Sequence, residues 1–516
     1  MRELSQNRIS EVALSLLVVL CPFIVGSILM FASTGKTLLD TVPYSNDETF
    51  HWHQSNTFRV AGFDGGYYTT SEVTSGAGWG HFYDWGSFYP ALYGSVGRVA
   101  GWSPASFALI NNAAFFLAAL LFIHLARLSP RQKLIFALAL AVFIPFQTFM
   151  FRSMLQVMHQ AIALVIAGIF AAVFSRQVSG RFVILSAVFM LLAGLMRPTW
   201  ALMLLPLFVL SRQKRSWRVI AVSLAIAVPA VLLVALIFES SGSPYPHFRK
   251  EFFENLTSPT EAISGMVAYI RQSLIWMSEG FPHVMGQRLQ ILLLLLALIG
   301  VGGWQFFQQR RKSHPNSTPD WQWEIAFHLY NLLVLYILNI ALHESVDSRG
   351  YRVMAPHLLI SLMLFISQRN WRFVAGLIVS SIMIIPITVP FYNEFTTLNM
   401  RRADEINAQM AAYVPQFEAA IPYDADAESA WCNTVTMSSW YPIVQVEREP
   451  GFLLSMQPGI GLSWVHWYLT PEEFKAKYML LSETDVTEWA DRLNLRSVRD
   501  FPGGTLYINE DSLCEE

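Results

Sequence analysis

The sequence is poor in charged residues. Asp, Glu, Lys and Arg make up 14% of its 516 residues, whereas soluble domains average about 25%. Hydrophobic residues make up 53%, and the mean hydropathy is +0.39. This deficit excludes an ordinary soluble protein and predicts that much of the chain faces lipid.

Cysteine is scarce as well. Cys21, Cys432 and Cys514 are too few for a disulfide scaffold, and no CxxC motif or Cys/His ligand cluster is present. In an oxidising compartment Cys432 and Cys514 could form one disulfide, but the sequence leaves both the bridged and the free state open.

Long hydrophobic segments recur along residues 1–391. The first, "EVALSLLVVLCPFIVGSILMFAS", exceeds a signal-peptide core and lacks a small-residue cleavage site, which predicts a retained membrane helix near 11–32. Further spans are predicted at 105–126, 133–150, 159–175, 219–239, 286–307, 324–342, 352–367 and 373–391.

The basic segments between these spans fit one side of the membrane, which the positive-inside rule assigns to the cytoplasm. They share that side only if 183–210 enters and returns as two short helices. Its turn would be Arg197-Pro198, because Pro198 cannot continue a helix without the loss of a hydrogen bond. The count is then eleven membrane helices with the N-terminus in the cytoplasm, and two long loops, 33–104 and 240–285, face outward. The basic segments are 127–133, 175–181, 211–218, 308–312 and 367–372.

The C-terminal residues have the opposite charge balance. Residues 392–516 hold 20 acidic and 8 basic residues, whereas the remainder holds 17 acidic and 27 basic. We therefore predict an α-helical polytopic membrane domain, 1–391, and a soluble acidic α/β domain outside the cytoplasm, 392–516.

Asp, Glu, Lys and Arg are absent from the middle of the predicted single spans. Proton-coupled transporters and pumps need such residues for their relays. The ionisable groups gather instead at the outer ends of helices, which favours a reaction at the outer face over transport.

Two acids directly follow the first span. Asp47 or Glu48 could act as a general base toward an acceptor hydroxyl or amine; the alternative is a pair of solvated loop acids. His51 and His53 could bind a metal or orient a phosphate, or they are interfacial histidines beside Trp52.

A second polar pair, His81 and Asp84, precedes an aromatic segment, 86–101, that we expect to lie as a helix at the membrane interface. Some mixture of these histidines and aspartates could bind a divalent metal. Their spacing matches no specific ligand signature, so no metal or other cofactor is assigned.

Arginines lie near the predicted outer helix ends. Arg152, Arg197, Arg349 and Arg352 offer planar sets of donors that suit phosphate oxygens, and His343 precedes the last two in the same segment. The alternative for each arginine is snorkelling to lipid headgroups. Arg197 stands out because it lies at a forced helix break on the side where the positive-inside rule disfavours it.

Several motifs, taken in their order along the chain, resemble those of the GT-C glycosyltransferases. The general plan is most similar to that of the protein O-mannosyltransferases and the aminoarabinose transferases. The motifs are "YSNDETFHW" after the first span, "SFYPALY" before the second, "FRSMLQV", "GLMRPTWALMLLPL" and "SRGYRVMAPHLLISLML". The resemblance covers most of 11–391, and family members often append a soluble outer domain in the place of 392–516.

The resemblance implies transfer of a sugar from a polyprenyl-phosphate carrier to an extracytoplasmic acceptor. It assigns Asp47 as the catalytic acid/base, supported by Glu48, and Arg197, Arg349 and Arg352 as contacts of the carrier phosphate. One departure matters. Many relatives carry an acid in the short loop after the third helix, whereas "RSMLQVMHQ" has none, so a metal requirement does not carry over.

The expected partners are this lipid-linked sugar, its acceptor and membrane lipids, with no nucleic acid. The rival interpretations are a polysaccharide polymerase or ligase at the outer face, a flippase for lipid-linked sugars, and a non-catalytic scaffold. A bacterial inner membrane is the expected location.

Overall fold

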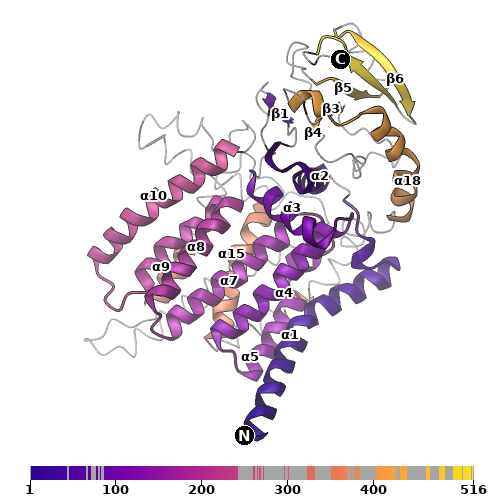
Figure 1. The fold of residues 1–516 in the computed structure, drawn as a ribbon. Helices are drawn as coiled ribbons and strands as arrows, with labels where there is room; N and C mark the ends of the chain where they lie inside the picture. Colours follow the sequence, from indigo (N-terminus) through magenta and orange to yellow (C-terminus); the bar gives the residue numbers. More distant parts are fainter. Residues whose placement is uncertain are drawn as a thin grey trace.

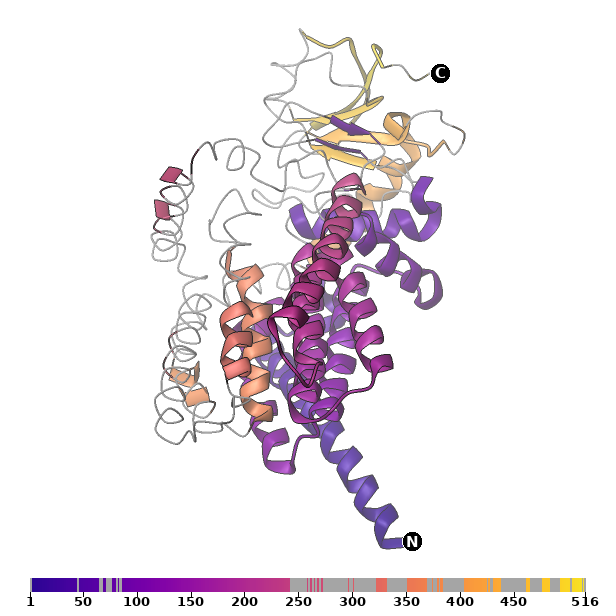
Figure 2. The ribbon, with the colours of Figure 1, turned by 90° about the vertical axis from the view of Figure 1, so that its left-hand side faces the viewer.

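The computed structural model describes most of the first 241 residues and parts of the remainder (Figure 1). A bundle of helices carries the N-terminus at one end and a five-stranded sheet at the other, so the two termini lie at opposite ends (Figure 2). The described residues are 2–43, 46–64, 68–70, 77–79, 82, 86–241, 322–331, 350–368, 403–424, 430–437, 461–464, 476–482, 492–501 and 504–512, with isolated residues between and after them.

Four of the described helices are long and apolar enough to cross a membrane. They match the predicted spans at 11–32, 105–126, 159–175 and 219–239. They are α1 (Arg2–Thr34), α4 (Ser106–Ala126), α7 (Gln156–Ser175) and α10 (Trp217–Ser241).

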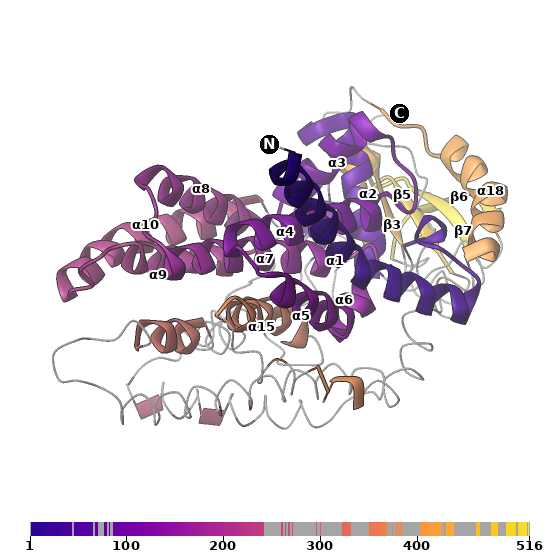
Figure 3. The same ribbon diagram turned by 90° about the horizontal axis from the view of Figure 1, so that it is seen from below.

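Helix α7 is the centre of the bundle. Of its apolar window, 89% is buried, against 17% in α10. It packs against α4 and against α15 (Gly350–Ser367), which lies on its other side (Figure 3). Small residues allow this close packing: a Cβ added at Gly168 would lie 3.1 Å from Leu125 of α4.

The predicted continuous span at 133–150 is wrong. The chain forms two shorter helices there, α5 (Pro130–Ala141) and α6 (Ile144–Phe149). Pro145 explains the break, because it has no N–H to donate to the carbonyl of Ala141. Helix α5 begins with Ser129 and Gln132 in a capping box.

The predicted break at Arg197-Pro198 is confirmed. Helix α8 (Gly180–Met196) ends where Arg197 adopts an extended conformation, with a φ of −161°. The 3₁₀ helix η3 (Pro198–Met203) follows, and α9 (Leu204–Leu210) packs beside α8.

The segment 33–104 is more ordered than the loop expected from its polarity. It contains α2 (Asn46–Ala61) and α3 (Phe88–Ala100), and α3 matches the helix predicted within 86–101. The two helices cross closely: a Cβ at Gly94 would lie 2.8 Å from the carbonyl oxygen of Ser55. The other elements of this segment are η1 (Leu38–Asp40), η2 (Gly62–Asp64), β1 (Tyr68–Thr70) and β2 (Ala77–Trp79).

The described C-terminal residues form a helix and a mixed sheet. In the strand order β4-β3-β5-β7-β6, β3 runs parallel to both neighbours and the other pairs are antiparallel. The elements are α18 (Ala403–Ala420), η5 (Ala430–Asn433), β3 (Thr434–Met437), β4 (Gly461–Trp464), β5 (Tyr478–Leu481), β6 (Leu495–Phe501) and β7 (Gly504–Asn509).

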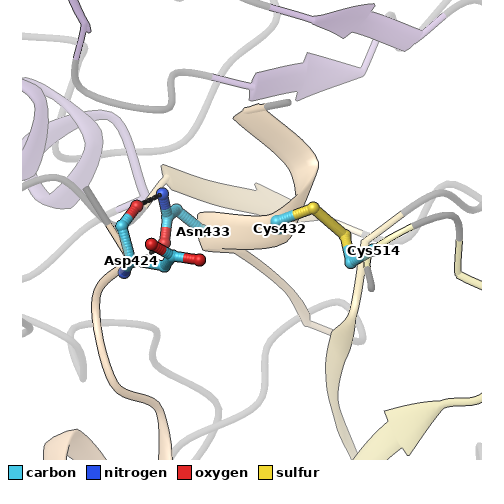
Figure 4. Close-up of a disulfide and its surroundings, with 4 residues drawn as sticks. All are labelled: Asp424, Cys432, Asn433 and Cys514. Carbon is cyan, nitrogen blue, oxygen red and sulfur yellow. Dashed lines mark hydrogen bonds between the residues drawn. A yellow bond between two sulfur atoms is a disulfide. The ribbon is translucent and has the colours of Figure 1, made fainter. Parts of the chain in front are cut away.

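A disulfide joins Cys432 in η5 to Cys514 beyond β7 (Figure 4). Beside it, Asn433 accepts a hydrogen bond from the backbone N–H of Asp424 at 2.9 Å and donates one to its carbonyl oxygen. At the sheet edge, β4 lies next to β1 of the N-terminal hairpin and near α2, which brings the sheet to the α2 end of the bundle (Figure 1).

Several predicted segments lie outside the described residues. They include nearly all of the loop 240–285, the spans 286–307 and 373–391 apart from isolated residues, and most of 324–342. The count of eleven spans and the division at residue 391 therefore stay predictions.

Candidate functional site

A buried ion pair joins α2 to the start of α7. Glu48, in the first turn of α2, is fully buried and pairs with the guanidinium of Arg152, which is 3% exposed. Arg152 lies in the turn between α6 and α7. A buried charge is tolerated only when it is paired and hydrogen-bonded, so this pair fixes α2 against the bundle.

Asp47 is the second residue of α2, and its side chain lies outside the described part of the chain. Successive residues of an α-helix project about 100° apart. The carboxylate of the next residue, Glu48, is engaged with Arg152.

The two histidines of α2 are both buried, each 2% exposed. The ring of His51 stacks on Phe107 of α4 and meets Tyr89 of α3 edge-on, with centroids 5.8 and 5.1 Å apart. His53 lies 3.4 Å from the hydroxyl of Thr57, one turn along α2. His51 thus connects α2 to the α3 and α4 end of the bundle.

Arg197 is a buried cation at the helix break. It is 6% exposed, and its Nη1 has no hydrogen-bond partner among the described residues. The guanidinium lies within electrostatic range of two further buried histidines, His159 and His357. His159 is also within range of His51, so the same site includes α2, α7, the α8–η3 junction and α15.

An aromatic stack lies beside Arg197. Trp200 of η3 donates from its indole N–H to Nδ1 of His159 at 3.1 Å, and its ring stacks on His357 with centroids 4.6 Å apart. His357 in turn contacts Asn331 at 3.1 Å and Thr199 at 3.4 Å. Sequence reasoning missed this stack, although "RPTW" and "VMHQ" were singled out for other reasons; a Trp directly after a broken helix was the available signal.

The start of α7 adds further polar atoms. Leu155 at the N-cap gives no side-chain acceptor to the first turn. Ser153 Oγ, Gln156 Oε1 and Gln160 Oε1 are buried and have no hydrogen-bond partner in the described structure. Helix N-termini favour anions because their first N–H groups are unsatisfied and the macrodipole is positive there.

The other predicted residues cannot be placed against this site. Arg352 lies in the first turn of α15, but its side chain is outside the described part of the chain. The sequence candidates that lie entirely outside it are His81, Asp84, His343 and Arg349. Within the described residues, no group of three His, Cys, Asp or Glu side chains could hold a metal.

No family model and no curated protein matches this chain. Three solved structures are similar to it over 96% of its length. ArnT from Cupriavidus metallidurans bound to undecaprenyl phosphate is 13% identical, with a TM-score of 0.41 and 99% of its own chain covered. The apo state of the same protein is 12% identical, with a TM-score of 0.40. The third is the archaeal oligosaccharyltransferase AglB from Archaeoglobus fulgidus, in complex with an inhibitory peptide and a dolichol-phosphate. It is 10% identical, with a TM-score of 0.45 and 74% of its own chain covered. Both are GT-C membrane glycosyltransferases, the class that the sequence motifs resemble.

Proposed function

We propose that the protein is a membrane glycosyltransferase that moves a sugar from a polyprenyl-phosphate carrier to an acceptor outside the cytoplasm. One observation carries the proposal: the buried guanidinium of Arg197, whose Nη1 has no hydrogen-bond partner among the described residues, lies in one cluster with His159 and with His51 of α2. An arginine that lacks an acceptor in a buried site is suited to a phosphate oxygen.

In this proposal Asp47 is the general base. It removes the proton of the acceptor hydroxyl or amine as that group attacks the anomeric carbon of the sugar. The bond from that carbon to the carrier phosphate breaks, and the phosphate leaves with the electron pair. Transfer in one displacement inverts the anomeric configuration.

Arg197 stabilises the charge that develops on the departing phosphate, and Arg349 and Arg352 are further candidates for this role. Glu48 and Arg152 hold α2, and thereby Asp47, in place through their buried pair. One carboxylate and these cations would suffice for the proposed steps, and we assign no metal to the site.

The proposed sidedness follows from the charges. Cytoplasmic basic loops would place α2 and the C-terminal sheet on the outer face of a membrane, with a bacterial inner membrane as the expected one. The disulfide Cys432–Cys514 supports this, because disulfides persist in oxidising compartments.

The test is Asp47→Asn beside wild type in lipid nanodiscs, with consumption of a panel of polyprenyl-phosphate sugars as the assay. We expect wild-type turnover and a loss of at least about 100-fold in Asp47→Asn, with carrier binding retained. Asp424→Asn, at an exposed carboxylate in the C-terminal region, is the matched control and should keep full activity.

Equal turnover by Asp47→Asn would remove Asp47 as the base. If Arg197→Gln then abolished activity, the polymerase or ligase class would be favoured, because it depends on arginines without this carboxylate. No turnover by either protein on any donor of the panel would count against the glycosyltransferase itself, and a lipid-flipping assay would follow.

A further inference from the structure

His159 is a fully buried histidine near the start of α7, and the proposed mechanism does not use it. Its Nδ1 lies 3.1 Å from the indole nitrogen of Trp200. Its Nε2 is buried and makes no hydrogen bond in the described structure. A buried polar nitrogen without a partner costs free energy, so this atom points to a ligand.

Trp200 determines which nitrogen of His159 carries the proton. An indole N–H can only donate, so Nδ1 of His159 must accept and therefore carries no proton. The imidazole is then neutral with its hydrogen on Nε2. Nε2 is accordingly a donor that lacks an acceptor.

His357, on the other face of Trp200, shows the opposite arrangement. Asn331 donates from its amide to the carbonyl oxygen of His357, which turns its Oδ1 toward Nδ1 of the same histidine. Nδ1 therefore donates, and Nε2 accepts from the hydroxyl of Thr199. Both nitrogens of His357 are satisfied, so its role is to hold the stack.

The open donor of His159 shares its surroundings with the open Nη1 donor of Arg197. His159 lies in the first turn of α7, where the helix dipole favours negative charge, and Arg197 lies at the junction of α8 and η3, within electrostatic range of His159. Two donors that lack a partner among the described residues, one neutral and one cationic, match an oxygen-rich anion better than a sugar hydroxyl, which would also require acceptors.

We propose that His159 is a phosphate-binding residue that donates from Nε2–H to a phosphate oxygen of the polyprenyl-phosphate carrier, next to Arg197. Trp200 is a positioning residue that holds His159 in the tautomer able to do so. The proposal rests on the proposed function, because it takes the carrier phosphate as the ligand of this site.

Two variants test the two ring nitrogens of His159 independently. In His159→Asn the amide oxygen can replace Nδ1 as the acceptor for Trp200, but the Nε2 donor is lost. His159→Gln returns an N–H near the Nε2 position. His328→Asn is the matched control: His328 is also buried with an unpartnered Nε2 among the described residues, but it bonds to Ser361, one turn of α15 beyond His357.

The measurement is the affinity of nanodisc-embedded protein for undecaprenyl phosphate. A hydrogen bond to a charged group accounts for about 10-fold to 100-fold in affinity. We expect His159→Asn to weaken binding by that factor, His159→Gln to recover most of it, and His328→Asn to match wild type. Undecaprenol should bind all four proteins equally, and phosphatidate in the nanodisc should not compete if the carrier phosphate is the ligand.

Trp200→Phe tests the positioning role and serves if His159→Asn does not fold. The phenyl ring keeps the stack on His357 but removes the donor. Solid-state ¹⁵N spectra of labelled histidine should show one Nε2–H tautomer for His159 in wild type and a mixture in Trp200→Phe, with several-fold weaker carrier binding.

Unchanged affinity in His159→Asn and Trp200→Phe, with weaker binding in Arg197→Gln, would overturn the role of His159 and leave the proposed site intact. Unchanged affinity in Arg197→Gln as well would overturn the site itself. Equal loss for undecaprenol and undecaprenyl phosphate in His159→Asn would show a structural effect and also overturn the inference, as would effective competition by phosphatidate.

Discussion

The α2 end of the bundle and the C-terminal sheet both contain ion pairs, but in different surroundings. In the bundle, the side chains of Glu48 and Arg152 are 0% and 4% exposed. In the sheet, those of Arg496 and Glu510 are 51% and 41% exposed, at 2.6 Å. Water can replace a lost partner in the second pair and cannot in the first. Burial, more than charge or distance, therefore decides which pair the fold depends on.

The same contrast applies to how each region is held together. Large buried rings and small residues packed between helices fill the bundle, with Trp200 and Phe107 both fully buried. Strand β6 is mostly exposed, and a covalent link, Cys432–Cys514, closes a loop in the C-terminal region. A crosslink adds more stability to a small region with limited apolar burial than it would add to a tightly packed bundle.

The largest expected effect comes from breaking the buried pair. Glu48→Gln removes the negative charge that pairs with the buried guanidinium of Arg152 and should destabilise the bundle by about 3–5 kcal/mol. Thermal and denaturant unfolding in detergent would measure this. Combining it with Arg152→Met should recover much of the loss, because no uncompensated charge then stays buried. A double variant no more stable than Glu48→Gln would contradict this account.

A smaller and more local effect is expected from the disulfide. Cys432→Ser with Cys514→Ser should destabilise the C-terminal region by about 2–4 kcal/mol, since the bridge closes a long loop, 82 residues in sequence separation. Hydrogen exchange should rise in β3, β5 and β7 but not in α4 or α7. Cys21→Ser, at the free cysteine, is the control and should change neither region. Faster exchange in α7 of the double variant would argue against two separable regions.

Hydropathy predicted the four long apolar helices α1, α4, α7 and α10, because a span needs only a long apolar run. The positive-inside rule located the break at Arg197, and Pro198 supported it, because a proline within a helix costs a backbone hydrogen bond. Hydropathy failed at 133–150, where Pro145 lay inside an apolar run and the break was overlooked.

Helix α2 was missed for a different reason. Its sequence, "NDETFHWHQSNTFRVA", is polar, yet residues 50–58 are all buried. That burial comes from tertiary packing against α3, where Gly94 allows contact. The partners in the site lie far apart in sequence, 104 residues for Glu48 and Arg152 and 41 for His159 and Trp200. A single sequence names such residues as candidates but carries no information about which of them meet.

The smallest expected effect is at the exposed pair. Arg496→Ala should change the stability of the C-terminal region by less than about 1 kcal/mol, because solvent screens both charges and ordering two long side chains offsets the attraction. Glu510→Ala should behave alike, and 1 M salt should erase the difference from wild type in each. Denaturant unfolding of these variants and of Glu48→Gln compares the loss of unfolding free energy at an exposed ion pair with the loss at a buried one. If Arg496→Ala cost as much as Glu48→Gln, burial would not be what separates the two pairs. The assignment of Glu48 and Arg152 as the anchor of α2 would then lose its physical basis.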